Sequence, residues 1–177
     1  MGRAWLLILA LAGCTSYTQE VAEPPPSPPQ VMAVGRIEPE RGEWERAALR
    51  FERSLVGALR ASKAFALVRS SVPDQVPGDW LVVDGRMLDA DDGSDFYQLF
   101  LGEWLAGPAA KVEVRVRGAD GRVLLAFTDK VLISSRSVDP FASDPPEVKH
   151  LIDQLAADAA QAIVGWVAGT PVSDTRF

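Results

Sequence analysis

Few residues have side chains suited to catalysis, since the chain of 177 residues contains one histidine and one cysteine. A hydrolase of the Ser-His-Asp type needs a positioned histidine, and His150 is the single candidate. It lies off the apolar stripe of the helix predicted around it, so we expect it to be exposed. The sequence also lacks a phosphate-binding P-loop and a glycine-rich dinucleotide motif. We therefore predict no catalytic residue, no cofactor and no enzymatic activity.

Carboxylates form the densest group of potential metal ligands, at Asp89, Asp91, Asp92 and Asp95. An EF-hand loop places a glycine sixth and a glutamate twelfth, whereas Gly93 is fifth and Phe100 twelfth when counted from Asp89. The spacing favours a solvated acidic turn, and we predict no metal site. Asp84 and Arg86 face the same side of a predicted strand and are interpreted as a polar edge pair.

The single cysteine, Cys14, follows a short apolar segment at the start of the chain. Arg3 precedes an apolar run over residues 4–12, and the small residue Gly13 leads into Cys14. A charged start, an apolar core of about ten residues and a small-residue end are typical of a secretory signal peptide. The run is too short for a transmembrane helix, which needs about 20 residues.

The sequence Leu11-Ala12-Gly13-Cys14 resembles the lipobox of bacterial lipoproteins. The resemblance implies cleavage between Gly13 and Cys14, a diacylglycerol on the thiol, and a fatty acyl chain such as palmitate on the new amine. Two or three acyl chains make a durable membrane anchor. Because Thr15 follows the cysteine in place of aspartate, the resemblance implies an outer-membrane lipoprotein facing the periplasm, with the inner membrane as the alternative. An ordinary signal peptide with a chance cysteine is the competing interpretation.

Composition indicates one globular domain and excludes several classes of protein. Apolar residues make up 47% of the chain, charged residues make up 24%, and the formal net charge is −6. These are ordinary globular values, and an acidic chain lacks the basic field that a nucleic-acid-binding protein shows. A single cysteine excludes an intrachain disulfide framework and a multi-cysteine zinc site.

The chain divides into three parts by composition. Residues 1–13 are the expected signal peptide, residues 14–30 the lipidated cysteine and a Pro-rich tether, and residues 31–177 a single periplasmic domain. Residues 15–30 contain five of the 13 prolines, which favours an extended spacer.

Hydrophobic periodicity predicts an α+β two-layer sandwich. Residues 111–117 alternate between valine and charged residues, and Asp120-Gly121 then marks a hairpin turn before the return strand. The predicted order is β-α-β-β-β-β-α, giving a mixed, mostly antiparallel sheet of about five strands with two helices on one face. The expected strands cover residues 31–37, 65–68, 80–88, 111–117 and 122–134, and the expected helices cover residues 42–62 and 145–168. The charged residues on the first helix, Arg46, Arg50, Glu52 and Arg53, are interpreted as a solvated face.

A short insertion at residues 89–108 interrupts this pattern with a dense apolar cluster. Two interpretations remain open, a short helix that completes the core and an exposed patch for a partner or a membrane. The candidate partner-binding residues are Phe96, Tyr97, Phe100, Leu101 and Trp104.

The domain resembles uncharacterised bacterial outer-membrane lipoproteins similar to the curli-secretion and penicillin-binding-protein-activator lipoproteins. The resemblance is carried by VMAVGRI (31–37), SKAFALV (62–68), LVVDGRMLDA (81–90) and AAKVEVRVRGADGRVLLA (109–126). It implies an envelope compartment and this fold, and it carries over no motif for a specific activity.

We therefore expect a membrane-anchored periplasmic lipoprotein acting as a binding or accessory module of the cell envelope. An envelope protein or a second copy of the chain would be its partner. The alternatives are an oligomeric component of an envelope secretion or assembly machine, and a small-ligand-binding or degenerate enzyme-like domain.

The lipobox resemblance predicts that Cys14 carries acyl chains. Labelled palmitate fed to cells making the protein should appear on the mature chain, and Cys14→Ser should abolish the label. A Cys14→Ser protein that carries the same label would contradict lipidation at this residue.

Overall fold

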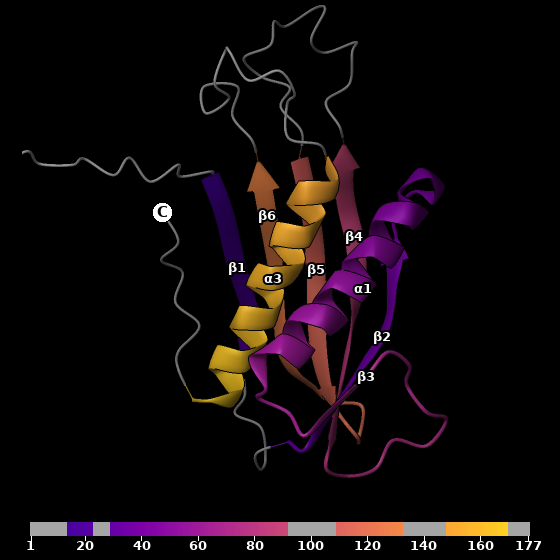
Figure 1. Ribbon diagram of the computed structural model, residues 1–177, viewed down its shortest axis with the longest axis vertical. Helices are drawn as coiled ribbons and strands as arrows, with labels where there is room; N and C mark the ends of the chain where they lie inside the picture. Colours follow the sequence, from indigo (N-terminus) through magenta and orange to yellow (C-terminus); the bar gives the residue numbers. More distant parts are fainter. Residues whose placement is uncertain (1–13, 23–28, 92–108, 133–147, 170–177) are drawn as a thin grey trace, which may run out of the picture.

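Six strands and two long helices make up an α+β fold in the computed structural model, which describes residues 14–22, 29–91, 109–132 and 148–169. Figure 1 shows both helices lying on the same face of a single twisted sheet. The strands are β1 (Cys14–Ala22), β2 (Val31–Pro39), β3 (Leu67–Arg69), β4 (Trp80–Asp91), β5 (Ala109–Gly118) and β6 (Val123–Leu132). The helices are the short 3-10 turn η1 (Gly42–Trp44), α1 (Glu45–Ser62) and α3 (Val148–Val167).

The sheet is mixed and has the strand order β1-β6-β5-β4-β2-β3. Strands β1, β6, β5 and β4 pair antiparallel, while β4, β2 and β3 are parallel to one another. The predicted order β-α-β-β-β-β-α is confirmed for the elements from β2 to α3, and so are the two helices on one face. The sheet has one strand more than the five that we predicted.

The hairpin of β5 and β6 forms where the alternation predicted it. Val112, Val114 and Val116 are fully buried beneath the helices, and Val114 lies opposite Phe127 in the ladder. The turn is closed by a hydrogen bond of 3.0 Å from the Gly121 amide to the Gly118 carbonyl. Gly121 has φ of +81°, a conformation that favours glycine and explains why Asp-Gly occurs at this point.

Each helix packs on the sheet through an apolar stripe along one of its faces, as the periodicity predicts. The stripe of α1 includes Phe51, Leu55 and Leu59, and that of α3 includes Leu155 and Ile163, all of them 0% exposed. The stripes pack on the buried face of the sheet and on each other, since contacts between α1 and α3 are extensive. None of the helices in the described part of the chain is long and apolar enough to cross a membrane.

The expected tether over residues 14–30 is wrong for its first half, because residues 14–22 form the edge strand β1. This strand pairs with β6 over its length, from Cys14 opposite Leu132 to Ala22 opposite Leu125. Thr15, Tyr17, Thr18 and Val21 are residues with high strand propensity, and the exposed edge of β6 supplies the partner backbone. The expected spacer therefore does not begin at Cys14.

The expected insertion also begins later than predicted. Asp89 and Asp91 are strand residues of β4, paired with Lys111 and Ala109 of β5, and do not lie in an acidic turn. The ladder continues because β5 starts at Ala109 and offers backbone partners as far as Asp91. The candidate partner-binding residues Phe96, Tyr97, Phe100, Leu101 and Trp104 lie outside the described residues.

Close packing of β4 against β5 predicts that Gly85 cannot be replaced. A Cβ atom at this position would lie 2.0 Å from the Glu113 carbonyl oxygen, which is backbone and cannot swing away. Gly85→Ala should therefore lower the free energy of unfolding by about 3 kcal/mol, the upper range for overpacking. Urea unfolding followed by circular dichroism measures this change.

Gly57 provides the matched control, because it is exposed on α1 and a Cβ atom there meets nothing within 4 Å. Gly57→Ala should leave stability unchanged or raise it by up to about 1 kcal/mol. Equal effects of the two substitutions would contradict the described register of β4 and β5.

Candidate functional site: a basic groove between the two helices

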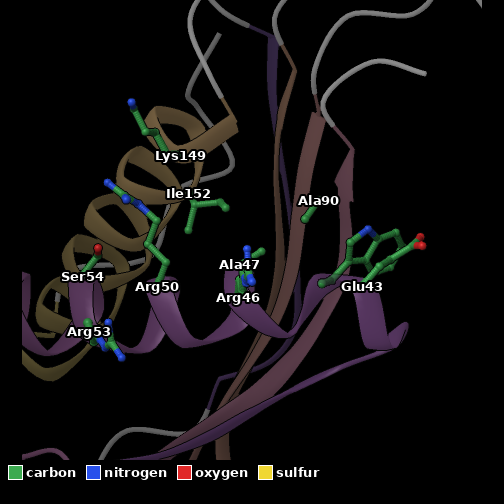
Figure 2. Close-up of a pocket in the computed structure, with 10 residues that line it drawn as sticks. Glu43, Arg46, Ala47, Arg50, Arg53, Ser54, Ala90, Lys149 and Ile152 are labelled. Carbon is green, nitrogen blue, oxygen red and sulfur yellow. The ribbon is translucent and has the colours of Figure 1, made fainter. Parts of the chain in front are cut away.

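A groove of about 590 Å³ opens where the first turns of α1 and α3 diverge above β4. Its apolar floor includes Ala47, Ala90 and Ile152, and Trp44 and Ser54 complete the lining from η1 and α1. Figure 2 shows Arg50 rising from α1 beside Lys149 and Ile152 of α3, with Ala90 of β4 across the opening. The charged lining residues are Glu43, Arg46, Arg50, Arg53 and Lys149.

The three arginines of the groove share one face of α1. Arg46, Arg50 and Arg53 follow the spacing i, i+4, i+7, which places them within one stripe along a helix. Like charges at this spacing repel one another, so the stripe carries an electrostatic cost unless anions lie close to it. Lys149 adds a fourth positive charge from α3.

Arg50 is fixed in place by an ion pair that joins the helices. Its guanidinium donates two hydrogen bonds to Asp153 of α3, from Nε at 2.9 Å and from a terminal nitrogen at 2.5 Å. The Ser54 hydroxyl donates a third hydrogen bond of 2.7 Å to the same carboxylate. This two-pronged geometry holds Arg50 rigid at the groove and links residues 103 positions apart.

The hydrogen bond from Arg50 lowers the pKa of Asp153, and burial opposes this only in part. The hydrogen bond from Ser54, the positive charge of Arg50 and the neighbouring His150 lower the pKa of this carboxyl further. Asp153 therefore stays ionised and keeps Arg50 paired, while no ion pair recorded within the described ranges involves Arg46 or Arg53. These two arginines are exposed at the mouth of the groove.

A second set of charges lies on the sheet face opposite to the helices. Asp84 pairs with Arg117, and Glu113 accepts hydrogen bonds of 2.7–3.0 Å from Arg86 and Arg115. Asp84 and Arg86 do face the same way, but each pairs with a β5 residue and not with the other. Burial raises the pKa of Glu113, but the two arginines outweigh it and lower the pKa overall. Since these charges satisfy one another within β5 and between β5 and β4, they stabilise the sheet and do not form a site.

The residues singled out in the sequence are not brought together by the fold. Cys14 is the first residue of β1, and His150 is exposed on α3, as expected. In the described ranges, no cluster of histidine, cysteine, aspartate and glutamate could hold a metal ion.

The groove is not predicted from the sequence, because the charged residues on α1 are interpreted there as a solvated face. That interpretation is wrong for Arg50, which is paired with Asp153 of α3. It is also wrong for Glu52, which accepts a hydrogen bond of 2.6 Å from the Ile37 amide.

The ion pair between Arg50 and Asp153 predicts a pH-dependent contribution to stability. Asp153→Asn should lower the free energy of unfolding by about 1 kcal/mol at pH 7, the upper range for a partly exposed pair. Because the pKa of Asp153 is depressed in the folded chain, this contribution is present above the unfolded value of about 3.9 and is lost as the pH falls through the folded value. Urea unfolding from pH 7 to pH 3 should show the variant and the parent converging in acid.

Asp74→Asn is the matched control, since Asp74 is exposed in the loop before β4 and shows no recorded ion pair with a described residue. It should leave stability unchanged over the same pH range. A penalty for Asp153→Asn that stays constant from pH 7 to pH 3 would exclude the ion pair as its cause.

Comparison with known proteins identifies likeness of fold alone. No protein-family model matches the chain, and no curated protein matches its sequence. Among solved structures, it is similar to the PelC dodecamer from Paraburkholderia phytofirmans, with a TM-score of 0.60 and 16% sequence identity. A point variant of the same dodecamer matches with a TM-score of 0.57 and 16% identity. Each match covers 89% of this chain and 99% of the other chain, so the whole PelC domain has a counterpart here.

Proposed function

We propose that this chain is a membrane-anchored periplasmic lipoprotein that associates with copies of itself to form an accessory assembly of the cell envelope. The observation that carries self-association is the extent of the match to the PelC dodecamers. Because 99% of the PelC chain aligns, the fold that the two proteins share forms the body of that dodecamer, with almost no appended segment. The sequence supports the anchor through the lipobox at Cys14.

Edge strands offer a surface for such association. The sheet ends in β1 on one side and in the three-residue strand β3 on the other. Leu67 of β3 is 49% exposed, the largest exposed fraction among the large apolar residues of the described ranges. An open edge with an apolar side chain favours contact with another chain.

Light scattering coupled to size-exclusion chromatography tests self-association. The mature chain with Cys14→Ser, which has no acyl chains, should show a mass many times that of one protomer, and the mass should fall on dilution. A mass of one protomer at every concentration would contradict the proposal.

Two exposed leucines help to locate the contact. Leu67→Asp should reduce the oligomer mass measured by light scattering, because it places a charge on the exposed edge strand. Leu49→Asp is the control, since Leu49 is 41% exposed on α1 and belongs to the helix layer and not to a strand. Loss of mass with Leu49→Asp and not with Leu67→Asp would place the contact on the helix layer.

A further inference from the structure

The basic groove lies at the same end of the sheet as Cys14. Backbone pairing joins Asp91 to Ala109, Ala109 to Leu132 and Leu132 to Cys14, so these residues form one row across four strands. Ala90, in the floor of the groove, belongs to the adjacent row. Three strand spacings separate β4 from β1, which is about 14 Å.

Pairing of β1 with β6 fixes the distance between the anchor position and the groove. A flexible spacer would let the domain turn freely, but residues 14–22 are hydrogen-bonded into the sheet. Acyl chains on Cys14 would therefore hold this end of the domain against the lipid surface. The opposite end, with the β5–β6 turn and the end of α1, would point away from the membrane.

The lining of the groove suits the chemistry of a lipid headgroup. Four basic residues and one acidic residue, Glu43, line it, although the chain as a whole has a net charge of −6. Ala47, Ala90 and Ile152 add an apolar floor, and the half-buried Trp44 adds an aromatic rim. Basic side chains bind phosphate, and tryptophan is enriched at the level of lipid headgroups. A free phosphate ion would use the arginines but not the apolar floor.

We infer that the groove binds the phosphate groups of anionic lipids in the membrane to which Cys14 is anchored. This inference rests on the proposed anchor, because the anchor places the groove at the lipid surface. Arg46, Arg53 and Lys149 contact the phosphates, while Arg50 is held in position by Asp153 and Ser54. The acyl chains alone hold the domain durably at the membrane, and binding of lipid phosphates in the groove sets its orientation there.

Vesicle cosedimentation of the mature chain carrying Cys14→Ser tests the groove without the anchor. The protein should bind vesicles of phosphatidylcholine with phosphatidylglycerol and should not bind vesicles of phosphatidylcholine alone. The triple variant Arg46→Gln, Arg53→Gln, Lys149→Gln should bind about a hundredfold more weakly, because each basic residue near an anionic surface contributes about a fivefold factor and the three factors multiply. All three side chains are exposed, so the variant should fold, and circular dichroism checks this.

The matched control is the triple variant Lys63→Gln, Arg69→Gln, Arg122→Gln. It removes the same charge from exposed residues at the opposite end of the domain. It should bind anionic vesicles within about twofold of the parent. Should the groove triple variant fail to fold, the double variant Arg46→Gln, Arg53→Gln takes its place.

The inference is overturned by no binding of the parent to anionic vesicles, by equal weakening in both triple variants, or by saturation of the groove by soluble glycerol phosphate with no vesicle binding. The third result would assign the groove to a soluble phosphate compound. Loss of oligomer mass in the groove variant without loss of vesicle binding would likewise assign it to a second copy of the chain. Palmitate labelling of Cys14 is measured separately, so failure of the anchor and failure of the groove are distinguishable.

Discussion

Burial of two helices on one face of one sheet is the constraint from which the other features follow. Each strand must turn alternate side chains toward that face, which is why Val112, Val114 and Val116 are fully buried while their neighbours on β5 are charged. Two helices on one face must also share a seam. In this helix–helix interface the apolar stripes pack together, and the ion pair of Arg50 and Asp153 links the two helices. Near the first turns of both helices the interface opens to form the basic groove.

Local pattern was sufficient to predict most of the fold. The alternation over residues 111–117 and the Asp120-Gly121 turn specify β5 and β6 without any distant contact. Strand β1 was missed because its partner, β6, lies more than a hundred residues further along the chain. The prolines that follow β1 also biased the whole segment toward an extended spacer. Edge strands of this kind depend on an available neighbour more than on their own sequence.

Prediction from local sequence pattern has the same limit at the candidate site, the basic groove. The spacing of Arg46, Arg50 and Arg53 was visible, but a stripe of charge on a helix is ordinarily solvated. Only the fold brings Lys149 and Asp153 from α3 to that stripe and Ala90 from β4 beneath it. Cys14 was identified from sequence because the apolar run that marks it is adjacent in the chain. Its place beside the groove follows from strand pairing and could not be predicted.

The end of the domain that faces the membrane decides whether the basic groove can meet lipid headgroups. Since the chain has one cysteine and acylation consumes its thiol, a cysteine introduced elsewhere can be labelled alone with a fluorophore. The acylated protein in vesicles with lipid-borne quenchers should show strong quenching for Lys149→Cys, at the groove, and little for Arg122→Cys, in the β5–β6 turn. Equal quenching at the two positions, or stronger quenching at Arg122→Cys, would contradict the orientation.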